Sequence, residues 1–145
     1  MLKLQIYELT WINMRSEELS LFVEEFVSCF EDYIKNAKEL YQAPDPRSVI
    51  TEIRETIHSL KQTCLMLDLP NLTNFFQSYE EFLQRVKLGG PKRIPYAVDK
   101  ALDIGYKKFK EIEVCLADGK PKEKIEKLQT IETNVEIESF YSYQG

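Results

Sequence analysis

His58 is the only histidine of the chain, and it lies in the segment IRETIHSLKQTCLMLDL. Read as a helix, this segment gathers its apolar side chains into one stripe, and His58 points about 135° away from the centre of that stripe. Lys61 lies one turn further on. Three more side chains share this side of the helix at contact spacing: Arg54, Gln62 and Leu65. An exposed imidazole beside an ammonium group has the chemistry of a phosphoryl acceptor, because it pairs a nucleophile with a cation.

Length and composition indicate one globular domain. The 145 residues are enough for one substantial core and too few for two. A net charge of -5 weighs against nucleic-acid binding, and glutamates interrupt the lysine-rich segments, which are typical of a solvated helix face. No apolar run approaches the length of a membrane span, and no secretion signal opens the chain. We therefore expect a cytoplasmic protein without a membrane or nucleic-acid partner.

No residues have the spacing of a metal, disulfide or nucleotide site. Cys29, Cys64 and Cys115 are odd in number and lack CxxC spacing, so we expect buried thiols in a reducing compartment. One histidine cannot supply the paired Glu-x-x-His ligands of a metal-binding helical bundle. Without a glycine-rich phosphate loop, the chain has no ATP site. We expect no cofactor, no metal and no ATP-dependent enzyme activity.

Helical periodicity accounts for most of the chain. Five helices are predicted, over about residues 16–41, 47–68, 72–86, 94–116 and from 121 on. The third carries a strongly aromatic apolar stripe, and Gly105 on the fourth should let a neighbour approach closely. In the fifth, Ile125, Leu128 and Val135 should face inward. Helices of this length with short connections favour an all-α, antiparallel four-helix bundle with an additional C-terminal helix.

The two ends of the chain fall outside this pattern. Residues 1–15 have apolar spacings that suit either a strand or a short helix, and we expect them to form a leader packed on the body. The bundle should span residues 16–138, and residues 139–145 should form a loose tail. The initial methionine and the tail favour a free-standing protein over the front end of a kinase.

The segment HSLKQTCLMLDL resembles the signature of histidine phosphotransfer (HPt) domains, which is H-x-x-K-G followed by small and apolar residues up to L-G. Glu80 lies 22 residues after His58. This spacing is similar to that of the glutamate that hydrogen bonds the phosphoacceptor in the N-terminal phosphotransfer domain of chemotaxis histidine kinases. The order of helices also agrees, with the histidine on the second and the glutamate on the third. The resemblance covers about residues 16–138.

The resemblance implies a phosphoryl carrier that moves the group on His58 between a histidine kinase or receiver domain and a receiver aspartate. Glu80 would accept one ring N–H and so fix the tautomer of the nucleophile. Lys61 would offset the charge of the phosphoryl group, and Arg54 would contribute more distantly. Any Mg²⁺ would belong to the response-regulator receiver domain. The partner would contact Arg54, Gln62, Leu65 and Gln77.

Two positions depart from the signature, and they leave a second hypothesis open. Gln62 replaces the first glycine and leans toward His58, where it would either hinder docking or donate its amide to the phosphoryl group. Asp68 replaces the second glycine and should affect only the end of the helix. The alternative is a degenerate module that docks receiver or kinase domains without being phosphorylated. An exposed histidine and a solvated Glu80 would also suit an ordinary surface.

Overall fold

The computed structural model describes residues 16–88, 94–130 and 133–141. These residues form an all-α fold without strands, as the periodicity predicts. The helices are α2 Ser16–Leu40, α3 Pro46–Met66, α4 Pro70–Arg85, α5 Tyr96–Ala117, α6 Pro121–Thr130 and α7 Asn134–Ser139. The predicted leader, residues 1–15, lies outside the described residues. None of the described helices combines the length and hydrophobicity needed to cross a bilayer.

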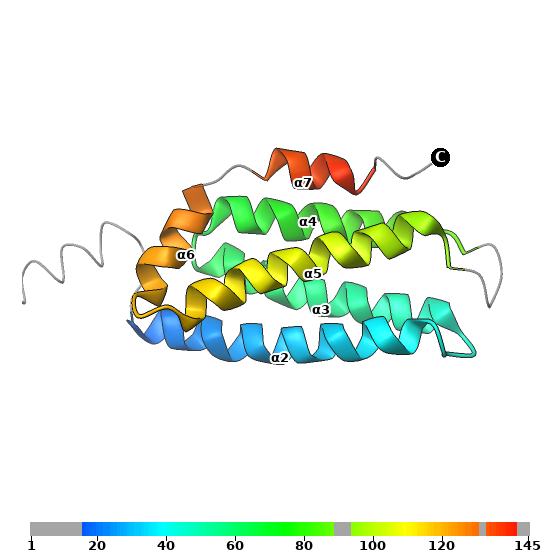
Figure 1. Ribbon diagram of the computed structural model, residues 1–145, viewed down its shortest axis with the longest axis horizontal. Helices are drawn as coiled ribbons and strands as arrows, with labels where there is room; N and C mark the ends of the chain where they lie inside the picture. Colours follow the sequence, from blue (N-terminus) through cyan, green and yellow to red (C-terminus); the bar gives the residue numbers. More distant parts are fainter. Residues whose placement is uncertain (1–15, 89–93, 131–132, 142–145) are drawn as a thin grey trace, which may run out of the picture.

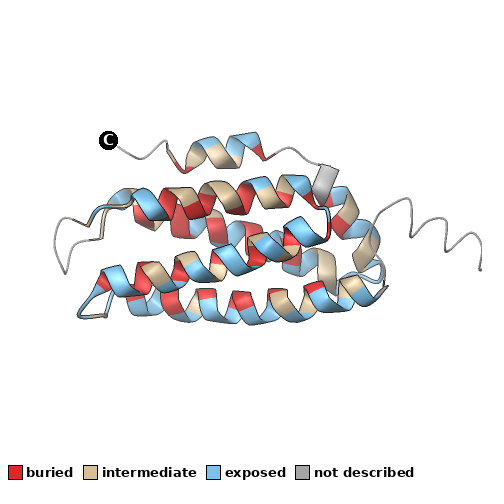
Figure 2. Cartoon of the chain, turned by 180° about the vertical axis from the view of Figure 1, so that it is seen from behind, coloured by how far each residue is buried: buried red, intermediate tan, exposed pale blue. Residues whose placement is uncertain are grey.

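The four longest helices, α2 to α5, run lengthwise beside one another (Figure 1). Successive helices α2 and α3, and α3 and α4, pack together, while α6 crosses one end and contacts α4 and α5. The short helix α7 returns along α4. Buried residues line the inner sides of the helices, and exposed residues cover their outer sides (Figure 2). This amphipathic division is what the helical spacing predicts.

The core is rich in aromatic rings. Phe109 of α5 lies 5.0 Å from the ring of Phe30 and 4.7 Å from that of Tyr33. The aromatic stripe of α4 is fully buried, as predicted; its rings are Phe75, Phe76, Tyr79 and Phe82. Gly105 is also buried, in close contact with tyrosines of α2 and α4. Large rings contribute most of the buried area in such a core, so they fix how the long helices pack.

The turn between α3 and α4 is closed by backbone hydrogen bonds. The N–H of Leu69 donates to the carbonyl of Cys64 at 3.0 Å, and the N–H of Asp68 donates to that of Leu65 at 3.2 Å. Asp68 has φ 58, in the left-handed region. This pattern is a Schellman motif, in which glycine is the preferred residue at the left-handed position. The departure of Asp68 from the HPt signature therefore lies at a helix end.

Two predictions about the C-terminal region are wrong. Val135 is 75% exposed, although Ile125 and Leu128 are buried as expected. The fifth predicted helix, α6, ends at Thr130, and Val135 belongs to a separate helix, α7. The 3.6-residue spacing that turns Ile125 and Leu128 inward therefore does not apply to Val135. The second error concerns the start of the tail predicted over residues 139–145, because Phe140 is only 1% exposed and packs in the core. Residues 142–145 lie outside the described residues.

Candidate functional site

Helices α3 and α4 position the predicted site residues. On α3, Ile57 and Leu60 are fully buried, which turns His58 outward, and 48% of the His58 side chain is exposed. On α4, the burial of Tyr79 turns the next side chain, Glu80, toward α3. The Nδ1 atom of His58 lies 2.8 Å from Oε1 of Glu80. The structure thus brings together the two residues that the HPt resemblance pairs.

Lys61 binds the same carboxylate. Its Nζ atom lies 2.8 Å from Oε2 of Glu80, so each carboxylate oxygen of Glu80 has one partner. The side chains of Lys61 and Glu80 are only 12% and 10% exposed. An ammonium group and a carboxylate this close, and largely shielded from water, form an ion pair. Lys61 therefore holds Glu80 in place, which the sequence did not predict.

The environment keeps Glu80 charged. Burial by itself would raise the pKa of Glu80, but hydrogen bonds from Lys61 and His58, with their positive charge, outweigh it and lower the pKa overall. An ionised carboxylate has no proton to donate, so Nδ1 of His58 must be the donor in their hydrogen bond. In the neutral imidazole the other nitrogen, Nε2, then carries the free lone pair. The arrangement selects one ring nitrogen as a nucleophile.

The other predicted site residues lie outside the triad formed by His58, Glu80 and Lys61. Gln77 donates to Oε1 of Glu81 at 2.8 Å. Among the described residues, Arg54 and Gln62 make no side-chain hydrogen bond or ion pair with the triad. Leu65 is 59% exposed, on the side of α3 that carries His58. These four residues are therefore not part of the triad. Those that are exposed remain accessible to a partner protein.

Sequence reasoning missed one exposed apolar residue near the site. Met66 is 72% exposed and directly follows Leu65 at the end of α3. Together they place two exposed apolar side chains at the end of the helix that carries His58. The sequence does contain a signal for this exposure, because helical spacing places Met66 outside the buried stripe of α3.

A polar groove of about 420 Å³ lies between α2 and α3. Its lining includes Glu55 and Ser59 of α3, which flank His58 in the sequence, and Cys29 of α2. The Cys29 thiol is a poor nucleophile, because burial and the nearby Glu25 carboxylate raise its pKa to about 12. Within the described ranges, no three His, Cys, Asp or Glu side chains are grouped to hold a metal ion.

The cysteines are mostly buried, as expected from their spacing. All three are free thiols; Cys29 and Cys64 are buried, and Cys115 is partly exposed. Burial raises the pKa of Cys64 well above its usual range.

Comparison of the chain with protein-family models, with curated proteins and with solved structures yields no significant match. The candidate site therefore depends on the geometry of His58, Glu80 and Lys61.

Proposed function

We propose that this chain is a histidine phosphotransfer protein of a two-component phosphorelay, with His58 as the phosphoacceptor. The observation that carries the proposal is the 2.8 Å contact between Nδ1 of His58 and a charged, nearly buried Glu80. A histidine on an ordinary solvated surface does not require a fixed carboxylate partner. Here the partner is itself fixed by Lys61, also at 2.8 Å. Positioning of this kind is the main requirement of phosphoryl transfer.

The transfer step follows from this geometry. Nε2 of neutral His58 attacks the phosphorus of an aspartyl phosphate on a receiver domain, so an N–P bond forms and the P–O bond to the aspartate breaks. The receiver aspartate leaves as a carboxylate. The proton on Nδ1 stays in place, and Glu80 offsets the positive charge that the ring acquires. Lys61 adds positive charge near the phosphoryl oxygens. The reverse step delivers the group to another receiver aspartate.

We infer that α2 to α5 act as an antiparallel four-helix bundle of the phosphotransfer type, with α6 and α7 added at its C-terminal side (Figure 1). The protein would carry a phosphoryl group without hydrolysing ATP. Mg²⁺ would belong to the receiver, and the cytoplasm would be the compartment. A receiver or kinase domain would contact the exposed Leu65 and Met66 at the end of α3.

One observation favours a second candidate function. Gln62 is exposed one turn after His58, where the HPt signature has glycine, so its side chain can stand in the way of a receiver. A module blocked in this way would still dock receiver or kinase domains through the same surface. The two candidates share partners and differ in whether His58 accepts a phosphoryl group.

Phosphoramidate separates the candidates without a partner. Attack by Nε2 of His58 breaks the P–N bond of phosphoramidate, forms the new N–P bond and releases ammonia. We expect an acid-labile signal by ³¹P NMR in the wild type and none in His58→Gln. Because any exposed histidine reacts slowly, the decisive variant is Glu80→Gln, which should slow labelling at least about 10-fold. The matched control is Glu81→Gln on the same helix, which should label at the wild-type rate.

Two results would overturn the carrier proposal. Equal labelling rates in the wild type and Glu80→Gln would make His58 an ordinary surface histidine. An unlabelled wild type, under conditions that label free histidine, would leave only docking. The physiological version of this experiment uses, as the phosphoryl donor, a phosphorylated receiver domain that co-purifies with the protein from the native cell. His58→Gln is again the control.

A further inference from the structure

The C-terminal helix α7 is held against α4 by an aromatic contact. Phe140 directly follows α7, and its ring stacks on that of Tyr79 with centroids 4.8 Å apart and an interplanar angle of 21°. The rings of Phe75 and Phe82 lie 5.4 and 6.0 Å from it. Phe140 is therefore seated among three aromatic side chains of α4. Loss of its ring would leave a cavity against this helix.

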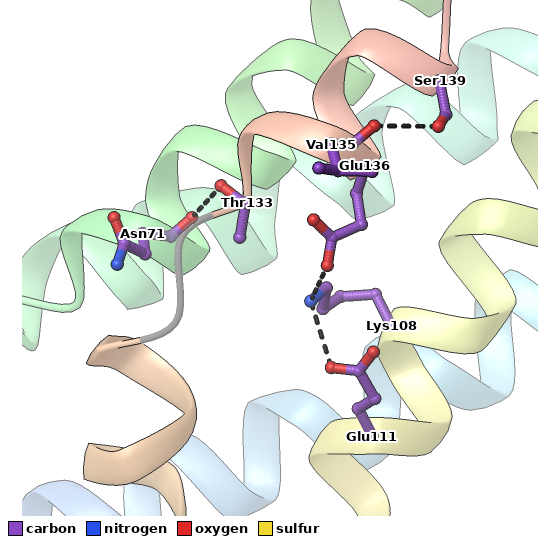
Figure 3. Close-up of polar contacts among 7 residues, drawn as sticks. All are labelled: Asn71, Lys108, Glu111, Thr133, Val135, Glu136 and Ser139. Atoms are coloured by element: carbon purple, nitrogen blue, oxygen red, sulfur yellow. Dashed lines mark hydrogen bonds and ion pairs between the residues drawn. The ribbon is translucent and has the colours of Figure 1, made fainter.

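An ion pair with the buried ammonium group of Lys108 holds α7 to α5 (Figure 3). Only 3% of the Lys108 side chain is exposed, and its Nζ atom lies 3.2 Å from Glu136 of α7 and 3.1 Å from Glu111. Lys108 also lies over the ring of Phe75, 5.2 Å from its centroid. A buried ammonium group needs such partners, so Glu136 cannot leave without cost. Just before α7, Thr133 adds a hydrogen bond to the carbonyl of Asn71 on α4.

Tyr79 links this contact to the core. Its hydroxyl lies 2.7 Å from that of Tyr33 on α2, and Tyr33 donates to the carbonyl of Leu102 on α5 at 2.7 Å. Tyr79 is fully buried, with Phe140 stacked on its ring. The hydroxyl network and Phe140 therefore restrain Tyr79 together. Because a side chain at this position turns with its helix, they also restrain rotation of α4 about its axis.

Glu80 is the next residue on α4, so it moves whenever α4 rotates. Side-chain atoms lie about 6 Å from the axis of a helix, and a rotation of about 10° therefore moves a carboxylate by about 1 Å. Displacements of about 1 Å caused by distant substitutions can slow a positioned reaction by up to about 100-fold. The contact between Glu80 and His58, at 2.8 Å, leaves no room for such a displacement.

We propose that Phe140 and Glu136 are positioning residues for phosphoryl transfer: they fix α7 on α4 and α5, and α7 fixes the rotation of α4 that aligns Glu80 with His58. This inference rests on the proposed function. It assigns the C-terminal segment a role in the reaction although that segment touches neither His58 nor Glu80 in any described polar contact. The role is distinct from general stability, because it predicts a change in the tautomer of one imidazole.

The tautomer of His58 provides the direct test. In alkaline buffer, ¹⁵N NMR of the single histidine reports which ring nitrogen carries the proton. In the wild type we expect the Nδ1–H form, held by Glu80. Phe140→Ala should shift the population toward the Nε2–H form, which dominates in free histidine. It should also slow labelling by phosphoramidate about 10-fold.

Matched variants separate positioning from stability. Phe140→Leu keeps an apolar side chain on Tyr79 and should restore most of the Nδ1–H form and of the labelling rate. Phe22→Ala removes a fully buried ring from α2, so it should lower stability without changing the tautomer. Glu136→Gln keeps the size of the side chain but removes the charge beside Lys108. It should produce a smaller shift in the same direction, and it stays informative if Phe140→Ala does not fold.

The inference is overturned if Phe140→Ala and Glu136→Gln both fold and keep the wild-type tautomer and labelling rate. It is also overturned if Phe22→Ala shifts the tautomer as much as Phe140→Ala, since the effect would then follow stability alone. Failure of the proposed function looks different. In that case the wild type is not labelled, or Glu80→Gln is labelled as fast, while the tautomer measurement still reports whether α7 aligns Glu80.

Discussion

Gly105 and Tyr79 approach so closely that a methyl group on Gly105 would lie 2.4 Å from Cε2 of Tyr79. The same methyl group would lie 2.4 Å from the hydroxyl oxygen of Tyr33. Both tyrosines are almost fully buried, so neither ring can move aside without disturbing the core. The absence of a side chain on α5 thus permits the hydroxyl pair that joins α2 to α4.

Gly105→Ala should therefore destabilise the protein. Overpacking of a dense core costs about 1–3 kcal/mol, and here it would exceed the gain in helix propensity from alanine. Urea denaturation measures the change in the free energy of unfolding. The control is Gly119→Ala, where nothing lies within 4 Å of the added methyl group, and stability should change by less than about 1 kcal/mol. Equal effects of the two substitutions would contradict the prediction.

The triad should stabilise the protein in a pH-dependent way. Although burial acts to raise it, the pKa of Glu80 is lower in the folded protein than the ordinary value of 4.5, because Lys61 and His58 bind the ionised form. A carboxyl group with a lowered pKa stabilises the folded state above its unfolded pKa, and this contribution disappears as the pH falls through the folded pKa. At pH 7, we expect Glu80→Gln to cost about 1–3 kcal/mol.

Urea denaturation of the wild type and Glu80→Gln from pH 7 to pH 3 measures this contribution. The difference between their free energies of unfolding should stay constant down to about pH 5 and then shrink toward lower pH. A difference that stays constant to pH 3 would show that Glu80 is not held in its charged form.

If His58 accepts a phosphoryl group as proposed, Gln62→Ala should speed its transfer from a receiver domain. The substitution removes the side chain that leans toward His58, and alanine keeps the helix intact, whereas glycine would cost about 1 kcal/mol of helix propensity. We expect a several-fold increase with a receiver and no change with phosphoramidate, which is too small to be obstructed. A slower rate with both donors would instead mean that the Gln62 amide holds the phosphoryl group.

Asp68→Gly should stabilise the turn between α3 and α4. The left-handed conformation of Asp68 is strained for a residue with a side chain, and glycine adopts it freely, so we expect a gain of about 1 kcal/mol in the free energy of unfolding. Asp68 also affects Glu126, whose pKa is raised mainly by burial and further by the charge of Asp68. Asp68→Asn removes that charge and keeps the side chain, so thermal denaturation of both variants separates the two effects.

The sequence predicts best what depends on local spacing. Periodicity within single helices turns His58 outward and buries the aromatic stripe of α4, because both follow from the 3.6-residue repeat. Glu80 meets His58 as predicted, but only the HPt resemblance gave the pairing, since spacing alone cannot set the rotation of one helix against another. For the same reason the ion pair between Lys61 and Glu80 was not predicted.

The largest errors come from the C-terminal region, where distant segments decide the structure. Phe140 lies in a segment of polar and aromatic residues without helical periodicity, and only the aromatic residues of α4, about sixty positions earlier, give it a buried site. Val135 was assigned to the wrong face because the break after Thr130 changes the helical phase. No local pattern in the sequence marks where α7 will dock.

The three-residue connection between α3 and α4 also bears on how the site forms during folding. His58 and Glu80 belong to consecutive helices separated by Leu67–Leu69, so little loop-closure entropy opposes their meeting. Contacts of this short range form early, whereas the hydrogen bond between Tyr33 and Leu102 must wait for segments 69 residues apart. His58 and Glu80 would thus meet within a nascent helical hairpin, and their contact would become stable only once α5 and α7 pack against it.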